Sequence, residues 1–373
     1  MTLGSSPVLL QEGKATFAVG QAFYRPKSAI ARDLAVLAAT VYRQRHGRLR
    51  VLDAMTGCGV RPLRYWLEAG ADWVWANEGN PELAETLAQN LAALPVNTCR
   101  ITQQDANQVF FACYQQRDFY DLVDIDNFGS PAPYVGTGLW ATRLGGMLYL
   151  TSTDGRATSG HDPERCLRTY GAYGRSHPAV HEQGLRLIIG HAAQTAAARG
   201  MGVEPVFSLF TGQVHRAMVR LVSKPTLTEA NYGFLAYCHR CGHFQAVDWR
   251  HLGRVNCLCG VQDPPVVSGP MWLGPLHNGE ILTEMQGLAD LWGWSSQAKL
   301  LDIMAEEIDL PPYYYPLGEI GRRGQMDIPN RDRLIAVLQT QGYQAAIPSM
   351  DWQGVKTNAA FGDCVAIARS IQS

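Results

Sequence analysis

A short polar motif follows an apolar segment and has the chemistry needed to activate an aromatic amine. Asp126-Asn127-Phe128-Gly129-Ser130-Pro131 comes directly after Tyr120–Ile125, which we expect to form a buried strand. An exocyclic amine such as that of guanine is a weak nucleophile, because its lone pair is delocalised into the ring. A carboxylate at Asp126 could accept an N–H of that amine and take its proton as a new bond forms. Phe128 could stack on the base and hold it in line for the reaction.

The same motif also has a purely structural interpretation. Asp124 and Asp126 could cap the turn that follows the strand, and Phe128 could belong to the core. We favour the catalytic interpretation, with Asp126 as the catalytic residue and with Asn127 and Phe128 as substrate-binding residues.

A glycine-containing loop after an earlier apolar segment predicts a cofactor site. The sequence Val-Leu-Asp-Ala-Met-Thr-Gly-Cys-Gly-Val-Arg places Asp53 at a strand end and Gly57 and Gly59 in the loop before a helix. Glycine lets the backbone pass close to a ligand, as it does in dinucleotide-binding folds. The third glycine of the dinucleotide pattern and a phosphate-binding Lys-Ser/Thr pair are missing here. The loop therefore favours a phosphate-free nucleoside ligand such as S-adenosylmethionine.

Two further acidic residues follow the next two strand candidates. Glu78 comes after Trp73–Ala76 and could accept hydrogen bonds from ribose hydroxyls, and Asp105-Ala106 comes after Arg100–Gln103 and could meet the adenine amino group. Each acid alone could instead cap a helix. Three acids at successive strand ends favour a ligand, because ligands of such sheets bind outside the carboxyl ends of the strands.

The elements that must position these residues alternate between strand and helix. We expect strands at 50–54, 73–76, 100–103, 120–125 and 147–151, and helices at 61–68, 81–94, 107–116 and 133–142. This alternation predicts βαβ units and a parallel sheet. A helix over His181–Arg199 and a hairpin of Val203–Thr211 with Arg216–Ser223 would complete a Rossmann-like α/β domain of the class I methyltransferase type.

The composition changes after this hairpin, which predicts a second and smaller domain. We place a methyltransferase domain at residues 1–224 and an α+β C-terminal domain at residues 225–373. Within the second domain, residues 281–308 and 331–342 have helical patterns, and residues 311–316 form a tyrosine-rich turn.

Four of the nine cysteines are clustered in this second domain. Cys238 and Cys241 are separated by fifteen residues from Cys257 and Cys259. Two close pairs at this distance resemble a zinc ribbon with thiolate ligands, although the second pair is C-x-C and not C-x-x-C. We expect a structural zinc ion; the alternative is that the thiols hold no metal. The other five cysteines are dispersed, which is typical of small buried side chains.

The overall composition is that of an ordinary globular protein. The 373 residues are 46% hydrophobic and 17% charged, and the net charge is −1. No apolar run reaches the roughly 18 residues that would span a bilayer, and the N-terminus lacks the pattern of a secretory signal. We therefore expect a cytoplasmic protein without a membrane partner, and a monomer. Two arginine clusters, at 43–50 and at 322–333, could contact RNA or could be solvated surface.

Taken together, the motifs resemble those of the tRNA guanine-26 N2-dimethyltransferase family. The resemblance extends from Glu12 to about Ala359. The segments that carry it are Glu12–Phe17, Phe23–Pro26, Ala31–Asp33, Asp126–Pro131, His181–Arg186, Gly269–His277 and Ile347–Asn358. The most specific of them is Gly-Pro-Met-Trp-Leu-Gly-Pro-Leu, which begins at Gly269.

The resemblance implies an activity and roles for particular residues. The enzyme would transfer methyl groups from S-adenosylmethionine to N2 of guanine in tRNA, giving N2-methyl- and N2,N2-dimethylguanosine. The residues implied to contact the cofactor are Arg32, Asp53, Arg61, Glu78 and Asp105. Asp126 would be the catalytic carboxylate, and Phe23 and Phe128 would hold a guanine that has left its stack.

Four positions depart from the family pattern, and other functions stay open. Asn127 replaces a proline, Ala31 replaces an asparagine, and Met350-Asp351 replaces Arg-Thr. The number of methyl groups added, the tRNAs used and the modification of a neighbouring guanine are not determined by the sequence. The alternatives are a methyltransferase acting on another nucleic acid or on a protein, and a non-catalytic RNA-binding relative.

Overall fold

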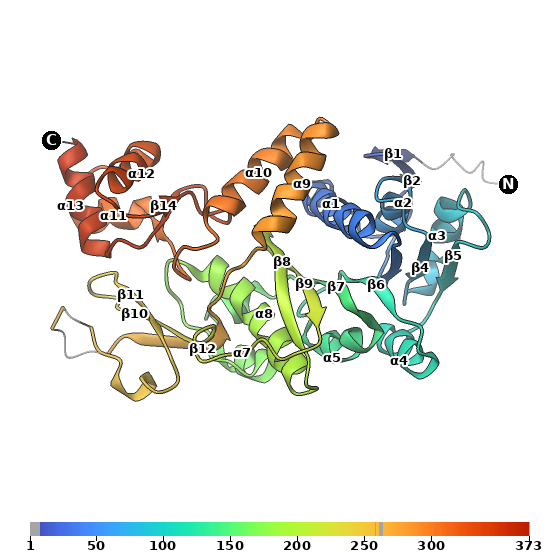
Figure 1. Cartoon of the computed structure of the whole chain (residues 1–373), viewed down its shortest axis with the longest axis horizontal. Helices are drawn as coiled ribbons and strands as arrows, with labels where there is room; N and C mark the ends of the chain where they lie inside the picture. The colour runs from blue at the N-terminus through green and yellow to red at the C-terminus, as the bar shows by residue number, and fades with distance from the viewer. Residues whose placement is uncertain (1–7, 258, 261–263, 373) are drawn as a thin grey trace.

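A seven-stranded mixed sheet forms the centre of the molecule in the computed structural model, which describes residues 8–257, 259–260 and 264–372 (Figure 1). Its order is β5-β4-β3-β6-β7-β9-β8. The strands are β3 Arg50–Asp53, β4 Trp73–Asn77, β5 Cys99–Thr102, β6 Tyr120–Ile125, β7 Thr142–Ser152, β8 Gly202–Thr211 and β9 Val214–Val222. Strands β5, β4, β3, β6 and β7 are parallel, whereas β9 pairs antiparallel with β7 and with β8. The predicted Rossmann-like sheet with its closing hairpin is confirmed.

Helices cover both faces of this sheet. Successive residues of a strand point to opposite faces, and here both faces carry apolar side chains. Leu52 and Val123 pack with α4, α5 and α8, whereas their neighbours Val51 and Leu122 pack with α1 on the other face. Helices α2 and α3 cover the β3–β4 end together with strand β2. The bounds are α1 Ala29–His46, α2 Val60–Leu67, α3 Ala84–Leu91, α4 Ala106–Gln116, α5 Ala132–Ala141 and α8 Val180–Ala197. Shorter helices are α6 Gly155–Thr158, α7 Pro163–Tyr170, η1 Pro26–Ser28, η2 Pro81–Leu83 and η3 Leu252–Arg254.

The N-terminal region forms elements that the sequence analysis did not predict. Strands β1 (Leu9–Glu12) and β2 (Ala15–Ala18) make a hairpin, and α1 follows it. Helix α1 buries two charged residues, Arg32 and Asp33, in addition to its apolar residues. It therefore lacks the clean alternation of polar and apolar faces by which a surface helix is found in a sequence.

The described residues of the C-terminal region form two small sheets and five α-helices. Strands β11, β10 and β12 form one antiparallel sheet, and β13, β15 and β14 form the other. The strands are β10 Tyr232–Tyr237, β11 Phe244–Val247, β12 Val266–Trp272, β13 Tyr315–Pro316, β14 Ala345–Ala346 and β15 Gly354–Thr357. The helices are α9 Gly279–Leu291, α10 Ser295–Glu306, α11 Leu317–Gly324, α12 Arg331–Thr340 and α13 Phe361–Gln372. Figure 1 shows α11 to α13 at the end of the molecule far from β4 and β5.

The helix predicted over residues 281–308 is wrong in one respect, because the structure divides it into α9 and α10. Trp292-Gly293-Trp294 lies between the two helices, and Gly293 has a φ of +73°. A left-handed residue ends an α-helix, and glycine adopts that conformation without strain. The two helices pack against each other and against α1 as a hairpin.

The predicted domain boundary coincides with the end of the central sheet but not with a division of the core. The sheet ends at Val222, and β10 begins at Tyr232. One apolar cluster nevertheless joins α8 to β12, and another joins α1 to α9 and α10. The proposed ranges also include residues 1–7, 258, 261–263 and 373, which lie outside the described residues. Two separate domains therefore stay a prediction.

Within the described ranges, none of the helices has the length and apolar character required to cross a bilayer.

Candidate active site and cysteine cluster

A cavity of about 640 Å³ opens at the carboxyl ends of the parallel strands. This volume lies in the range of small-molecule sites in proteins. Residues of the predicted site that line it are Phe23, Arg32, Gly57, Arg61, Glu78, Asp105, Ala106, Asp126, Asn127 and Phe128. Gly59 and Asp53 are not among its lining residues. The structure thus brings ten of the twelve predicted substrate, catalytic and cofactor positions to one cavity.

In the glycine loop between β3 and α2, the backbone at Gly57 lines the cavity without a side chain in front of it. Gly57 has a φ of +58°, and a Cβ built there meets no described atom within 4 Å. Its N–H donates to Glu78 Oε2 over 2.7 Å. Gly59, with a φ of +86°, is the N-cap of α2, and a Cβ there would come within 2.8 Å of Leu87 Cδ1. Gly57 therefore faces the cavity, whereas Gly59 permits close packing behind it.

Asp53 supports this loop from behind. It is completely buried, and its carboxylate accepts a hydrogen bond from Thr56 Oγ1 over 3.0 Å. Burial raises the pKa of Asp53 well above its usual range, and the nearby Asp124 adds to this effect. A buried carboxyl group that bonds to the loop is placed to hold the loop in shape. A direct contact of Asp53 with a cofactor stays a prediction.

Glu78 and Asp105 lie in the cavity at the ends of β4 and β5, and both also bond to backbone groups. Glu78 Oε1 accepts from the N–H of Asn80 over 2.9 Å. Asp105 is the N-cap of α4, where its Oδ1 accepts from the N–H of Asn107 over 2.9 Å and of Gln108 over 3.4 Å. The interpretation of Asp105 as a helix cap is therefore correct, and it accounts for one of the two carboxylate oxygens. Both bonds use Oδ1, which leaves Oδ2 for a ligand.

Arg61 connects two aspartates at the end of β6. Its guanidinium is buried and donates from Nη1 to Asp124 over 2.8 Å and from Nη2 to Asp126. Asp124 is fully buried, whereas 29% of the Asp126 side chain is exposed. Burial tends to raise the pKa of Asp126, but Arg61 and Arg216 outweigh it, so that the pKa lies below its ordinary value. Asp126 is consequently an ionised hydrogen-bond acceptor that faces the cavity.

Phe23 and Phe128 come together at the mouth of the cavity. Their exposed fractions are 68% and 74%, and their ring centroids lie 5.1 Å apart with the planes at 71°. A base held between two parallel rings needs about two contact distances of roughly 3.5 Å each. The rings therefore meet edge to face and must separate before they could hold a base between them.

Asn127 stabilises the turn that follows β6. Its amide nitrogen donates to the carbonyl oxygens of Phe128 and Ser130, over 2.8 Å in both cases. A proline at this position could not make these bonds. Asn127 thus replaces a stiff residue by a side chain that fixes the same turn through hydrogen bonds.

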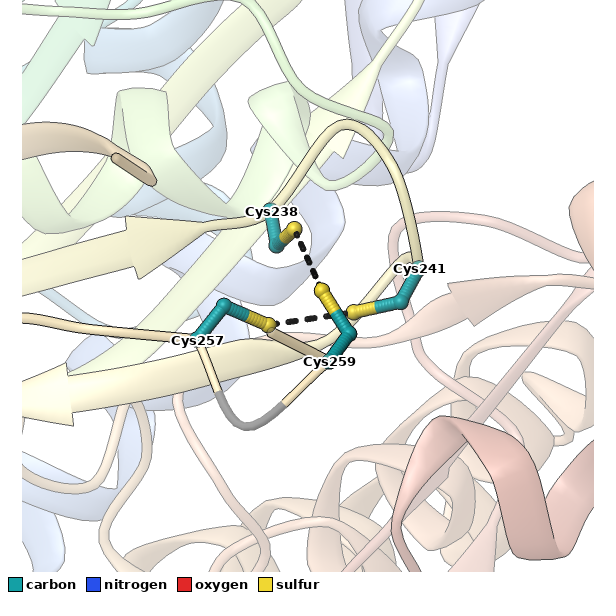
Figure 2. Close-up of side chains that lie close together, drawn as sticks. All are labelled: Cys238, Cys241, Cys257 and Cys259. Carbon is teal, nitrogen blue, oxygen red and sulfur yellow. Dashed lines mark hydrogen bonds between the residues drawn. The ribbon is translucent and has the colours of Figure 1, made fainter. Parts of the chain in front are cut away.

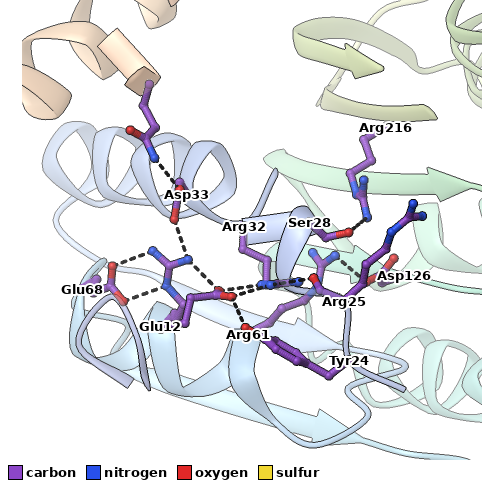
Figure 3. A network of polar contacts seen from close by, with 12 residues as sticks. Glu12, Tyr24, Arg25, Ser28, Arg32, Asp33, Arg61, Glu68, Asp126 and Arg216 are labelled. Carbon is purple, nitrogen blue, oxygen red and sulfur yellow. Dashed lines mark hydrogen bonds and ion pairs between the residues drawn. The ribbon is translucent and has the colours of Figure 1, made fainter. Parts of the chain in front are cut away.

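Arg32 lines the cavity, but its guanidinium is bound within the protein. Its Nε donates to Glu12 Oε1 over 2.6 Å, and Nη2 pairs with Oε2 of the same carboxylate. Tyr24 also bonds to Glu12 (Figure 3), and so does Arg64 of α2. Burial raises the pKa of Glu12, but Arg32 and its other partners lower it to about 2. Glu12 had no role predicted from the sequence, and in the structure it positions Arg32.

The four clustered cysteines converge in the C-terminal region. Cys238 and Cys241 lie in the turn after β10, and Cys257 and Cys259 lie before β12 (Figure 2). All four sulfur atoms lie within 4.8 Å of one another. The Cys238–Cys259 and Cys241–Cys257 sulfur distances are 3.7 and 3.3 Å. Four sulfurs bound to one zinc at roughly 2.3 Å would be about 3.8 Å apart, so the cluster fits a tetrahedral ion with little movement.

The predicted arginine clusters are largely occupied by internal contacts. Arg43, Arg45 and Arg50 form ion pairs with Asp72, Glu284 and Asp118. Arg323 donates to the carbonyl oxygens of His239 and Arg240, beside the cysteine cluster. The structure therefore favours a structural role for these four arginines.

The sheet order, the closing antiparallel strands and the acidic strand ends around one cavity define a class I methyltransferase fold. The chain matches the family described as N2,N2-dimethylguanosine tRNA methyltransferase over residues 4–369. It therefore belongs to that family.

Relatives with established names match over nearly the full length. The tRNA (guanine(26)-N(2))-dimethyltransferase of Thermococcus kodakarensis is 30% identical over 393 aligned positions, covering 98% of this chain and 99% of that protein. The enzyme of the same name from Pyrococcus furiosus is 29% identical, covering 98% and 97%. The solved structure of Trm1 from Pyrococcus horikoshii with S-adenosyl-L-methionine has a TM-score of 0.85 at 26% identity, covering 96% of this chain and 99% of that one.

Proposed function

We propose that this protein transfers methyl groups from S-adenosylmethionine to the exocyclic N2 of a guanine in tRNA. Position 26 is the target named for its relatives. The observation that carries the proposal is an ionised Asp126 that faces a cavity bordered by the strand-end acids Glu78 and Asp105. The cavity thus has room for a nucleoside cofactor beside a group that can bind an amine.

The residues of the cavity fit S-adenosylmethionine. Glu78 and Asp105 would accept hydrogen bonds from the ribose and the adenine, and Gly57 would let the ligand approach the backbone. Arg61 and Arg32 border the same space. When bound, the cofactor supplies a methyl group on a positively charged sulfur, which the amine nitrogen takes while the carbon–sulfur bonding electrons stay on sulfur.

Asp126 would bind and deprotonate the amine. Its carboxylate accepts one N–H of guanine N2, which raises the electron density on nitrogen and orients its lone pair. The proton then moves to the carboxylate as the nitrogen gains its fourth bond. A second methyl group would require the same steps on the remaining N–H.

Phe23 and Phe128 would hold the base at the cavity mouth. Both rings are largely exposed, and neither is fixed by surrounding side chains to the degree of a core residue. A base that leaves its stack could separate the rings and stack on them, which offsets part of the cost of unstacking.

The cysteine cluster would hold a structural zinc ion. All four thiolates point toward one centre, which leaves no open coordination position for catalysis. Arg323 of α11 bonds to the Cys238–Cys241 turn, so the ion would fix the C-terminal helices to the β10–β12 sheet. We propose that this region, residues 225–373, contributes to tRNA binding.

The test is methyl transfer to unmodified tRNA transcripts, with the nucleosides identified by mass spectrometry. N2-methylguanosine or N2,N2-dimethylguanosine at position 26 would establish substrate, atom and number of methyl groups together. No product across a full set of tRNAs, with cofactor binding intact in calorimetry, would favour another nucleic acid or a protein as substrate. If the protein neither methylates tRNA nor binds the cofactor, a non-catalytic RNA-binding function would be favoured.

We also propose that the enzyme acts as a monomer in the cytoplasm. The family is described as a tRNA methyltransferase. Light scattering of the purified protein tests the monomeric state, because a dimer would have twice the mass.

A further inference from the structure

Arg216 is a buried cation whose own hydrogen-bond donors the proposed methyl transfer does not use. It lies on β9, opposite Thr151 of β7, and lines the cavity together with Asp126. Arg216 is 3% exposed, and its Nε and Nη1 have no hydrogen-bond partner among the described residues. Its Nη2 donates to the Ser28 hydroxyl over 3.3 Å (Figure 3). Most of its hydrogen-bonding capacity is therefore unused.

Other buried arginines of this protein differ from Arg216 in having carboxylate partners. Arg61, Arg64 and Arg186 each form an ion pair of 2.9 Å or less. Burial tends to lower the pKa of both Arg61 and Arg216; two aspartates reverse this at Arg61, whereas at Arg216 burial prevails. A buried charge without a partner costs stability, and such exceptions are expected where a ligand supplies the partner.

The position of Arg216 in the sheet indicates which ligand it meets. The acids proposed for the cofactor follow β4 and β5, Asp126 follows β6, and β9 lies beyond β7 in the same sheet. Arg216 is thus on the side of Asp126 that is away from Glu78 and Asp105. A base whose amine bonds to Asp126 would extend toward Arg216.

The edge of guanine matches this pair of side chains. It presents the N2 amine, the N1–H and the O6 carbonyl in a row, so that two donors are followed by an acceptor. A carboxylate binds the donor end, and a guanidinium is the side chain that most often binds the acceptor atoms of guanine in nucleic-acid recognition.

We propose that Arg216 donates hydrogen bonds to O6 of the target guanine and thereby selects this base. The proposal rests on the proposed function, because it assumes that guanine N2 meets Asp126. A purine with hydrogen or an amino group at C6 would leave the buried guanidinium without its acceptor, and such a mismatch is strongly rejected by sites built for hydrogen bonding.

The test compares two tRNA transcripts that differ in one base. One carries guanine at position 26 and the other carries 2-aminopurine, which keeps the N2 amine but lacks both O6 and the N1–H. We would measure kcat/KM of the unaltered protein, of R216Q and of the control R220Q on both. Arg220 lies on the same strand but pairs with Glu204 outside the cavity. Product from the guanine tRNA with the unaltered protein tests the proposed function separately.

The expected result is a loss that depends on the substrate. R216Q should lower kcat/KM on the guanine tRNA by on the order of 10- to 100-fold more than on the 2-aminopurine tRNA, where only its effect on the charge of Asp126 remains. R220Q should preserve the discrimination between the two. The comparison cancels any general reduction of kcat/KM that 2-aminopurine causes, because the unaltered protein and R216Q are measured on the same two tRNAs.

Two results would overturn the proposal. An equal loss on both tRNAs would indicate that Arg216 acts only through the charge of Asp126, or binds a phosphate or the cofactor, and calorimetry with S-adenosylmethionine would identify the cofactor role. No loss on either would indicate a purely structural arginine. If R216Q does not fold, R216K must show the same substrate-dependent loss, because lysine cannot reproduce the planar donor geometry of arginine.

Discussion

At the scale of single residues, Asp126 combines weak basicity with access to the cavity. Arg61 and Arg216 hold its pKa below the ordinary value although the residue is partly enclosed. Weak basicity suits the reaction, because a guanine nitrogen that gains a methyl group becomes strongly acidic and gives up its proton readily. The geometry therefore provides a charged hydrogen-bond acceptor at Asp126 and not a strong base.

The first prediction concerns the charge of Asp126. D126N keeps the size of the side chain but cannot take the proton, so single-turnover methyl transfer should fall about 10²- to 10⁴-fold while cofactor binding in calorimetry stays close to normal. D118N is the control, since Asp118 precedes the same strand at its opposite end and pairs with Arg50. Turnover of D126N within a few-fold of the unaltered rate would refute the role of the carboxylate.

The second prediction concerns the backbone at Gly57. G57A adds a methyl group toward the cavity at a left-handed residue, and we expect the dissociation constant for S-adenosylmethionine to rise at least about 10-fold, with a stability loss of about 1 kcal/mol. Gly47 has a comparable φ of +73° and no described atom within 4 Å of an added Cβ, but it ends α1 outside the cavity. G47A should therefore lose similar stability and bind the cofactor normally. Equal cofactor affinities would show that Gly57 does not approach the ligand.

How far the sequence predicts the site depends on the distance between partners. Gly57, Glu78, Asp105 and Asp126 follow strand candidates, so their meeting at one edge could be expected from the parallel sheet alone. The pairing of Phe23 and Phe128 around a base came from resemblance, and their direct edge-to-face contact in the structure depends on packing that no local pattern encodes. Arg216 sits inside an apolar strand pattern, and its lack of a carboxylate partner becomes visible only in three dimensions.

At the scale of elements, the two cysteine pairs are positioned by the β10–β12 sheet and the turns at its end. Gly242 and Gly260 follow the pairs with φ values of +81° and +71°, which permits the tight turns that such ligands require. The sulfurs can therefore converge although the second pair has the shorter spacing.

The third prediction concerns the metal. Elemental analysis of the purified protein should find one zinc per chain, and a chelator or C241S should remove it and lower the melting temperature by more than about 5 °C. C99S is the control, because Cys99 is also partly buried but lies on β5 outside the cluster. Zinc-free protein with an unchanged melting temperature would mean that the thiols hold no structural ion.

The sequence predicts the elements of the sheet better than those outside it. The parallel strands have short apolar patterns and polar ends. Four of the five were predicted to within one residue at each end, and β7 begins five residues earlier than predicted. Helix α1 escaped prediction because its buried Arg32 and Asp33 find their partners at Glu12 and Arg64, in other elements. The separation of α9 from α10 could have been predicted from Trp292-Gly293-Trp294, because a glycine can end a helix even where the residues on both sides have a helical pattern.

At the scale of the whole molecule, buried charges connect the two predicted domains. Lys356 of β15 donates to Glu182 of α8 over 2.6 Å and lies 3.5 Å from Glu307, which follows α10. His277 and Ser349 also contact Glu307. Burial raises the pKa of Glu307, but Lys356, His277 and Ser349 lower it to about 2 from its ordinary 4.5.

The fourth prediction follows from this shift. A carboxyl group whose pKa is lower in the folded protein stabilises it above the unfolded value, and this stability is lost as the pH falls from about 4.5 toward 2. E307Q should cost about 3–5 kcal/mol at neutral pH, because it leaves a buried Lys356 poorly compensated, and should make stability less dependent on acid. Urea denaturation at neutral pH and at about pH 4 measures both. The exposed pair of Glu229 and Arg250 provides the control, and E229Q should cost about 1 kcal/mol or less. An E307Q protein with the unaltered acid dependence would contradict the role of this carboxylate.

The packing of the α9–α10 hairpin on α1 has a consequence for how this enzyme could be divided. Ile281, Met285 and Leu301 share a buried cluster with Leu34 and Leu37, and Gln297 bonds to Asp33, next to the cavity residue Arg32. A polypeptide cut after the central sheet would expose this apolar surface on α1, whose first turn carries the cavity residue Arg32. The part of the chain that carries the cavity therefore depends on α9 and α10 for its packing.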